Sequence, residues 1–285
     1  MKAYSIRIFL PDGVPDGLRI IEKSNWTGLG VVCPRPLLNN AKSRDEFSKT
    51  GVYILSGPAE SGGLPTVYIG EAESIRPRLE SHASNKDFWT SVTFFVSKDD
   101  NLNKAHVQYL ESRLVGLAKE TKRSTLENAT EPSLPSLSEA DRADVEGFLD
   151  EMLLCLPIVG LTVFEKPSAP PIENVQLKLA GPDATATGYE SADGFVVLAG
   201  SKGRLKETKS FHNYVSRLRE TLSEQGVVYA EGKHLILKQD YEFSSPSTAA
   251  AVILGRNANG RIEWKDPKGL TLKELQEGKS LTGNT

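Results

Sequence analysis

Six side chains that could bind or activate a phosphate ester follow one another along a single stretch of the chain: Tyr53, Tyr68, Arg78, His82, Glu111 and Asn128. A phenol and an imidazole can move protons, provided that a neighbour lowers the pKa of the phenol. A guanidinium can hold a phosphate by two hydrogen bonds and stabilise the charge that develops on it. A carboxylate together with water and phosphate oxygens is a sufficient set of ligands for Mg²⁺. Together, these side chains could bind a phosphate group and a divalent cation.

The two tyrosines stand in short β-branched and aromatic runs, 51–55 and 66–69, which predict two strands. The residues between them, 56–65, are rich in Gly, Ser and Pro and predict a loop. If the strands are antiparallel neighbours, both hydroxyls can emerge on one face of the sheet. For either tyrosine alone, the simpler interpretation is that tyrosine is a good strand residue.

Arg78 and His82 belong to a predicted helix over 74–82 and are four residues apart, so they share one helical surface. Arg76 is the competing arginine, but it does not share this surface with His82. Two roles are open for His82: a hydrogen bond that helps Tyr53 lose its proton, or a direct contact with phosphate. A single histidine on a helix is more often structural.

Glu111 lies on a predicted amphipathic helix over 104–119, and its neighbours on the same face are Val107, Leu114 and Ala118. A carboxylate in an apolar stripe is costly unless it is paired or bound to a metal. The alternative to a metal is an ion pair with a buried arginine. Lys104, at the start of this helix, is a candidate phosphate contact.

In this order, Gly51-Val52-Tyr53, Val67-Tyr68-Ile69-Gly70 and the four residues that follow resemble the catalytic domain of the GIY-YIG nucleases. The resemblance implies a small antiparallel sheet flanked by helices and one bound divalent metal, Mg²⁺ or Mn²⁺, on Glu111. It also implies that Tyr53, aided by His82, deprotonates water while Arg78 stabilises the transition state. Asn128 falls where the family often keeps an asparagine near the phosphate or metal; a turn or cap is the other interpretation. The loop 56–65 is longer than in minimal members of the family.

The chain is long enough for two domains, and the fold class that we expect is α/β (α+β). The Pro-rich segment 166–172 is the best candidate for a linker between domains. Phrases such as Gly194–Ser201 and Asn259–Trp264 resemble an uncharacterised domain attached to this nuclease module in bacterial proteins. The predicted parts are an N-terminal β-rich extension (1–48), the nuclease domain with a trailing helix (49–165), the linker (166–179) and a smaller accessory α+β domain (180–280).

The second domain contains a basic stretch, 199–219, with six Lys or Arg residues and the single acidic residue Glu207. Aromatic rings are interleaved with this charge, a pattern that suits a phosphate backbone and base stacking. A solvated loop and helix face is the other interpretation. The candidate nucleic-acid contacts are Lys202, Arg204, Lys206, Lys209 and Arg217.

The overall charge of −3 does not exclude DNA as a partner, because residues 131–174 alone hold nine acidic and two basic residues. The start of the chain lacks the pattern of a secretory signal, and no apolar run is long enough to span a bilayer. We therefore expect a cytoplasmic protein without a membrane partner. Cys33 and Cys155 are expected to be buried free thiols rather than metal ligands.

From these observations we expect a metal-dependent DNA endonuclease that acts on double-stranded DNA, with a role in restriction or defence against foreign DNA. Two other interpretations stay open: a DNA-binding or regulatory module that does not cleave, and a repair-type nuclease that incises structured DNA. The sequence leaves open whether the protein is a monomer or a homodimer.

Overall fold

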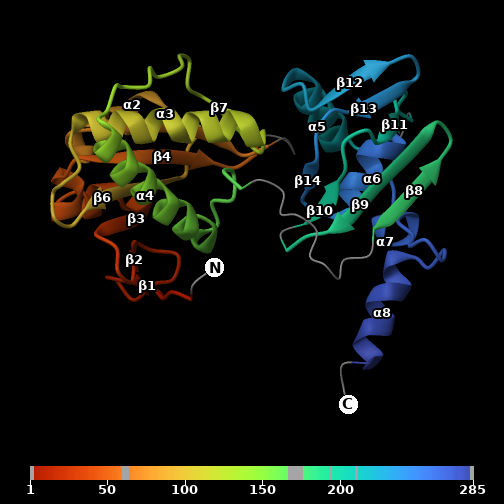
Figure 1. Ribbon diagram of the computed structural model, residues 1–285, viewed down its shortest axis with the longest axis horizontal. Helices are drawn as coiled ribbons and strands as arrows, with labels where there is room; N and C mark the ends of the chain where they lie inside the picture. Colours follow the sequence, from red (N-terminus) through yellow and green to blue (C-terminus); the bar gives the residue numbers. More distant parts are fainter. Residues whose placement is uncertain (1–2, 60–63, 166–175, 193, 209–210, 283–285) are drawn as a thin grey trace. The chain divides into compact units, whose positions relative to one another are not determined.

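The computed structural model describes residues 3–59, 64–165, 176–192, 194–208 and 211–282. These residues form two compact units, the first ending at Phe164 and the second beginning at Glu165 (Figure 1). Within the described residues, each unit contains one seven-stranded sheet with helices. The predicted mixed α+β class is therefore confirmed.

The sheet of the first unit consists of antiparallel neighbours, except that β5 and β7 are parallel. β3 pairs with β6 over its whole length, from Gly28 opposite Ser97 to Pro34 opposite Ser91. The segment predicted as an N-terminal extension thus supplies three strands to the same sheet as the two tyrosines. In spatial order the strands are β1 (Ile6–Phe9), β2 (Arg19–Lys23), β3 (Gly28–Pro34), β6 (Ser91–Ser97), β4 (Gly51–Gly57), β5 (Thr66–Ala72) and β7 (Thr125–Leu126).

Helices cover both faces of this sheet, so its central strand β4 is buried on both sides. Tyr53 and Leu55 belong to the core under α1 (Leu38–Ala41), the 3-10 turn Asp45–Ser48 and α2 (Ile75–Asn85). Val52 and Ile54 point the other way, into the core under α3 (Lys104–Thr121) and α4 (Glu139–Cys155). A strand with two covered faces reads as a continuous apolar run, which is the pattern of residues 52–55.

Helix α3 has well-defined ends that fix where Glu111 lies. The Asn103 side chain accepts a hydrogen bond from the backbone of His106, whose ring is in turn hydrogen-bonded to the backbone of Asn103, forming a capping box. At the other end Lys122 takes a left-handed conformation (φ 54°) that stops the helix. The predicted apolar neighbours of Glu111 are all buried: Val107, Leu114 and Ala118.

The sheet of the second unit has the order β12-β13-β11-β9-β10-β14, with β8 paired to β9. Its helices are α5 (Asn213–Glu224), α6 (Pro246–Leu254), α7 (Gly260–Glu263) and α8 (Leu272–Thr282). Its strands are β8 (Leu177–Gly181), β9 (Ala184–Glu190), β10 (Phe195–Val197), β11 (Lys202–Arg204), β12 (Val228–Glu231), β13 (His234–Leu237) and β14 (Tyr241–Phe243).

Residues 260–263 form the helix α7, and the Asn259 side chain caps it by accepting a hydrogen bond from the backbone N–H of Arg261. One expectation about this half of the chain is corrected. The end of the expected linker, from Leu177, belongs to strand β8, while 166–175 lies outside the described residues. Within the described part of the chain, none of the helices has the length and apolar character needed to cross a bilayer.

Candidate active site

The two tyrosines lie on the same face of the sheet, on adjacent antiparallel strands, as predicted. Tyr53 of β4 is opposite Gly70 of β5, and Tyr68 of β5 is opposite Leu55 of β4. Residues opposite one another in such a pair share a face, so the two rings are diagonal neighbours with centroids 6.3 Å apart. Gly70 is required at its position because a Cβ there would collide with the hydroxyl of Tyr53.

His82 connects helix α2 to this tyrosine pair. Its Nε2 lies 2.8 Å from the hydroxyl of Tyr53, and its ring centroid lies 5.0 Å from that of Tyr68. The predicted hydrogen bond between His82 and Tyr53 is therefore confirmed. Burial, followed by the charges of Lys86 and Arg78, lowers the pKa of His82 to about 4. At neutral pH the imidazole is therefore uncharged, and its Nε2 can accept a hydrogen bond from the Tyr53 hydroxyl.

The structure does not favour the expected role of Tyr53 as the group that deprotonates water. Its side chain is completely buried, with 0% exposure. Burial and then the neighbouring Tyr68 raise the pKa of Tyr53 above the usual range of a phenol. A buried, protonated phenol bonded to His82 can orient the imidazole, but it cannot serve as a base.

An open cavity of about 370 Å³ lies beside strand β5, and Tyr68, but not Tyr53, lines it. The cavity occurs where the sheet loses an edge strand, because β7 pairs only with Thr66 and Val67. Beyond that point, side chains from both faces of β5 can meet. The remaining lining residues are Glu71, Arg78, Lys86, Glu111, Glu127, Asn128, Ala129, Thr130 and Pro132.

Asn128 holds the rim of this cavity against the sheet. Its Oδ1 accepts a hydrogen bond from the backbone N–H of Ile69 (3.0 Å), and its Nδ2 donates one to the carbonyl of the same residue (2.7 Å). The side chain thus continues the ladder that β7 began. Asn128 lines the predicted site, but its amide is engaged with backbone, so its role here is to fix the segment 129–132.

Two cations face the cavity, and only one of them was predicted. Arg78 is exposed on α2, as expected for a group that receives a phosphate. Lys86, which was missed, lines the same cavity and lies with its Nζ 4.6 Å from the centroid of the Tyr68 ring. The signal was present in the sequence, because residues 78, 82 and 86 follow one another at intervals of four.

The carboxylates of the cavity come from the opposite face of the sheet. Burial and then the charge of the neighbouring Glu71 raise the pKa of Glu111 to about 7. The two carboxylates thus lie close enough for their negative charges to repel each other. Glu71 directly follows the Val67–Gly70 phrase and was also missed. Lys104, expected to bind phosphate, instead forms an ion pair with Glu71, with its Nζ 2.7 and 2.9 Å from the two carboxylate oxygens.

These groups are compatible with one hard divalent cation. Burial makes the negative charge of half-buried Glu111 unfavourable, and a bound cation would offset that unfavourable free energy. Carboxylate oxygens are ligands that suit Mg²⁺ or Mn²⁺. Among the residues that the structure describes, no cluster of three or more His, Cys, Asp or Glu side chains could form a full protein cage. Any cation here would therefore rest on Glu111, with water and phosphate oxygens as its other ligands.

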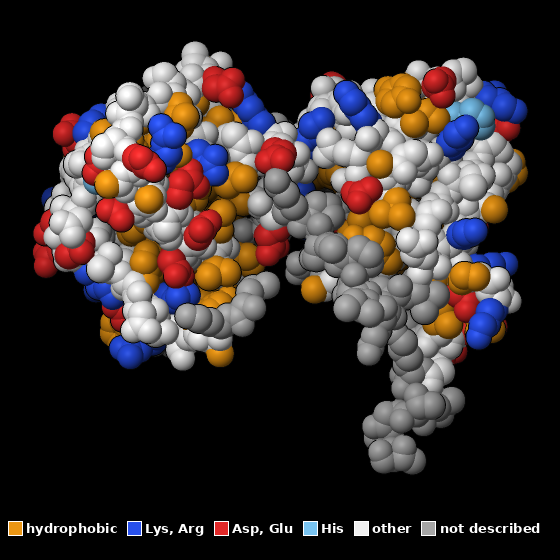
Figure 2. All heavy atoms as spheres, in the orientation of Figure 1, with side chains coloured by type: hydrophobic (Ala, Val, Ile, Leu, Met, Phe, Trp, Pro, Cys, Tyr) orange, Lys and Arg blue, Asp and Glu red, His pale blue; other side chains and the backbone are white. Residues whose placement is uncertain are grey.

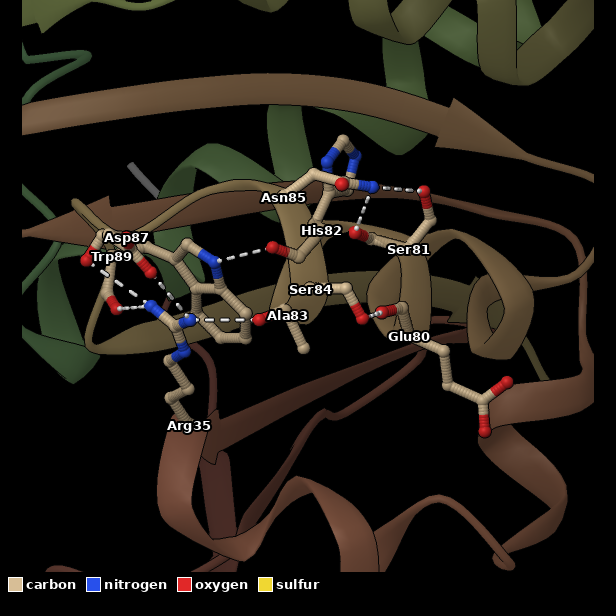
Figure 3. Close-up of polar contacts among 9 residues, drawn as sticks. All are labelled: Arg35, Glu80, Ser81, His82, Ala83, Ser84, Asn85, Asp87 and Trp89. Carbon is tan, nitrogen blue, oxygen red and sulfur yellow. Dashed lines mark hydrogen bonds and ion pairs between the residues drawn. The ribbon is translucent and has the colours of Figure 1, made fainter.

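Arg35, from the segment that precedes β4, holds the end of helix α2 and the loop that follows it (Figure 3). Its guanidinium donates hydrogen bonds to the backbone carbonyls of Ala83 (2.9 Å), Asp87 (3.2 Å) and Trp89 (3.3 Å). The same group lies 4.8 Å from the Trp89 ring centroid. Arg35 therefore fixes the path of the backbone on both sides of Lys86.

The candidate nucleic-acid contacts of the second unit lie on different elements. Lys202 and Arg204 lie on strand β11, whereas Arg217 is exposed on helix α5. Lys206 follows β11 and is exposed, and Lys209 lies outside the described residues. Part of the predicted positive charge is internal, because buried Arg219 pairs with Glu207 at 3.0 Å.

The second unit is the part of the chain for which a comparison gives a match. Residues 177–276 match the family described as Domain of unknown function (DUF4357). The comparisons with curated proteins and with solved structures gave no match. The expected uncharacterised C-terminal domain is thus present, and it begins at the first residue of β8.

Proposed function

We propose that the first unit is a metal-dependent endonuclease that hydrolyses DNA phosphodiester bonds, with a site of the GIY-YIG type. The observation that carries this proposal is the composition of the cavity beside β5. Four kinds of side chain line it: the phenol of Tyr68 on β5, the cations Arg78 on α2 and Lys86 just after α2, and the carboxylate of Glu111 on α3. The pKa of Glu111 is raised to about 7. Such a combination can receive a phosphate, neutralise its charge and hold a divalent cation.

Glu111 would hold the cation, with Glu71 raising the negative potential around it. Bound there, Mg²⁺ or Mn²⁺ would polarise the phosphate and stabilise the leaving oxygen. The protein's own contribution is the placement of the carboxylate on a capped helix, half-buried between apolar neighbours. That placement limits the approach of bulk water and strengthens electrostatic interactions.

Arg78 and Lys86 would bind the non-bridging oxygens of the scissile phosphate. The charge on these oxygens grows in the transition state, so both cations bind the transition state more tightly than the substrate. The carboxylates on the far wall balance this positive charge in the absence of DNA. Arg35 would act as a positioning residue, because it touches the backbone around Lys86 rather than the substrate.

Tyr68 is the group placed to orient and deprotonate the attacking water. Its own proton would first pass to solvent, and the phenolate, stabilised by the charge of Lys86 over the ring, would then accept a proton from the attacking water. Neutral His82 packs beside the same ring. The water oxygen bonds to phosphorus, one P–O bond breaks, and the leaving oxygen is protonated by solvent.

Incubation of the full chain with supercoiled plasmid DNA in Mg²⁺ tests this proposal. We expect nicked and linear products, no products in EDTA, and a loss of about 10²-fold or more in Glu111→Gln. Glu80→Gln is the matched control, because Glu80 lies on α2, outside the lining of the cavity, in a surface ion pair with Lys42. Cleavage that survives in Glu111→Gln at the wild-type rate would contradict the assigned site.

The choice among restriction, repair-type incision and DNA binding without cleavage is an outcome of the same assay. We expect intact duplex to be cut, as a role in restriction or defence requires. Preferential cutting of forked or single-stranded substrates would favour repair-type incision. Retention of DNA without cleavage in Mg²⁺ and in Mn²⁺ would favour the regulatory module instead.

A further inference from the structure

One face of the sheet in the second unit carries exposed side chains across five strands. The register places Lys202 of β11 opposite Ile236 of β13, and Ile236 opposite Tyr229 of β12. On the other side Lys202 is opposite Thr185 of β9. Residues opposite one another share a face. The open sheet face is defined here by Lys178, Ala180, Thr185, Lys202, Arg204, Tyr229 and His234.

The opposite face of the same strands is covered by helix α6. A Cβ added to Gly203, the residue between Lys202 and Arg204, would lie 2.9 Å from the carbonyl oxygen of Ile253 on that helix. The alternate residues of β8 and β9 are accordingly buried, among them Leu179 and Ala186. The residues that define the open sheet face therefore lie on the side of the sheet that α6 does not cover. Ile236, opposite Lys202, also lies on this side and is buried.

The open sheet face is basic. Lys178 and Lys202 are exposed on it and Arg204 is half-buried, while Lys265 joins the same side through its bridge to Lys178. Of the nearby acidic groups, Asp183 is paired with Lys233, and exposed Glu231 lies opposite His234 on this face. The four basic side chains Lys178, Lys202, Arg204 and Lys265 outnumber these carboxylates. In Figure 2, Lys, Arg and His side chains lie around the ends of β11, β12 and β13, with acidic and apolar side chains among them. This charge suits a polyanion that lies across the strands.

Aromatic surface lies beside this charge. Tyr229 is 45% exposed on the edge strand β12, in the same cross-strand row as Lys202. His234, half-buried, lies in the neighbouring row opposite Arg204, with its Nδ1 3.1 Å from the carbonyl oxygen of Asp183. Exposed rings on a flat basic surface stack on nucleic-acid bases, and stacking needs bases that are not already stacked within a duplex.

We propose that the open sheet face binds a single strand of DNA, with its phosphates on the lysines and Arg204 and a base stacked on Tyr229. This site lies in a different unit from the cavity beside β5, and the proposal does not depend on cleavage there. It replaces the predicted continuous patch over 199–219 with residues brought together by strand pairing. Its members Lys178, Tyr229 and His234, which supply charge and aromatic rings, lie outside that segment.

Fluorescence anisotropy with a labelled 20-nucleotide single strand and the matching duplex tests this proposal. The full chain is used in EDTA and in a Glu111→Gln background, so that binding is measured whether or not the protein is a nuclease. We expect the single strand to bind more tightly than the duplex. Lys178→Glu/Lys202→Glu should weaken binding of the single strand by about tenfold or more, and lower the slope of log K against log salt by about 1.4.

Tyr229→Ala separates stacking from charge, because it should weaken binding by about fivefold or more without changing the salt slope. Arg261→Glu/Lys273→Glu is the matched control, with two exposed cations of helices α7 and α8 reversed. If a charge-reversal variant unfolds, Lys178→Gln/Lys202→Gln replaces it, and far-UV circular dichroism verifies the fold. Equal losses in the control pair, or wild-type affinity in the sheet-face variants, would overturn the proposal.

Discussion

The hydroxyl of Tyr53 lies 2.8 Å from Nε2 of His82, with the phenol fully buried and the imidazole half-buried. One consequence is that the two tyrosines of the pair have different roles. Tyr53 fixes the orientation of His82 from inside the core, and Tyr68 faces the cavity in which a phosphate can bind.

The first prediction compares the two phenols. Tyr68→Phe removes the group that faces the attacking water, and we expect the single-turnover cleavage rate to fall by about 10²-fold or more. Tyr53→Phe removes only an internal hydrogen bond, and we expect a loss of about tenfold. Single-turnover rates of cleavage of a labelled duplex, measured in saturating Mg²⁺, would check this. A larger loss in Tyr53→Phe than in Tyr68→Phe would show that the roles are reversed.

The second prediction concerns Glu111 and pH. Its pKa is raised to about 7, so the carboxyl is largely protonated at pH 6 and a cation must displace that proton. Affinity for Mg²⁺ should rise by about tenfold per pH unit below 7 and level off above it. Calorimetry in buffers of different ionisation enthalpy should detect the release of close to one proton at pH 6 and little at pH 8. A pH-independent affinity would contradict this.

The same shift has a consequence for stability without metal. Because the folded protein holds this proton more tightly than the unfolded chain, the contribution of Glu111 to stability is present below pH 4.5 and is lost as pH rises through 7. Chemical unfolding of the wild type and of Glu111→Gln in EDTA should show this. As pH rises from 5 to 8, the unfolding free energy of Glu111→Gln should increase relative to that of the wild type.

The third prediction concerns His82, whose pKa is shifted in the opposite direction to that of Glu111. The pKa of His82 is lowered to about 4, so its contribution to stability is present above pH 6.5 and is lost as pH falls towards 4. Nuclear magnetic resonance of the imidazole should show a titration midpoint well below 6.5. A midpoint at or above 6.5 would mean that His82 is more solvated than the structure indicates.

The fourth prediction tests the packing of the tyrosine pair. Gly70→Ala places a methyl group against the hydroxyl of Tyr53, so the ring must move and its bond to His82 is disturbed. We expect a loss of about 1–3 kcal/mol in unfolding free energy and reduced cleavage. Gly116→Ala is the control, because that position in α3 has open space around it and should gain about 0.5–1 kcal/mol.

The fifth prediction concerns Arg35. Arg35→Lys keeps the charge but cannot reach three carbonyls and stack on Trp89 at once, so the loop that carries Lys86 should loosen. We expect kcat to fall by about tenfold and amide exchange to increase at residues 84–89. Arg44→Lys is the control, since Arg44 forms an ion pair with its near neighbour Glu46 and is not bonded to the loop around Lys86. Unchanged exchange at 84–89 would contradict a positioning role.

Local patterns were sufficient to predict most elements and part of the site. The runs around Tyr53 and Tyr68 predicted adjacent strands, and the apolar spacing around Glu111 predicted the helix that carries it. Burial depends on contacts between residues that are distant in the sequence. The resemblance to the nuclease family therefore implied that Tyr53 is a base, although the side chain is fully buried in the core beneath α2.

The contacts that the missed residues make form only through tertiary structure. Glu71 faces Glu111 because strand β5 lies beside helix α3, and Lys86 reaches Tyr68 because Arg35 fixes the loop after α2. On the second unit, Lys178 and Lys202 share a face only through the pairing of β8, β9 and β11. Sequence order placed none of these pairs together.

The most direct test of the central claim is to locate the cation. Fe²⁺ bound in place of Mg²⁺ generates hydroxyl radicals that cut the polypeptide beside the metal, and mass spectrometry identifies the new ends. We predict cuts near Glu71, Glu111 and Thr130, suppressed by excess Mg²⁺ and absent in Glu111→Gln. Cuts confined to other segments, or an unchanged pattern in Glu111→Gln, would contradict a metal-dependent nuclease site at the edge of this sheet.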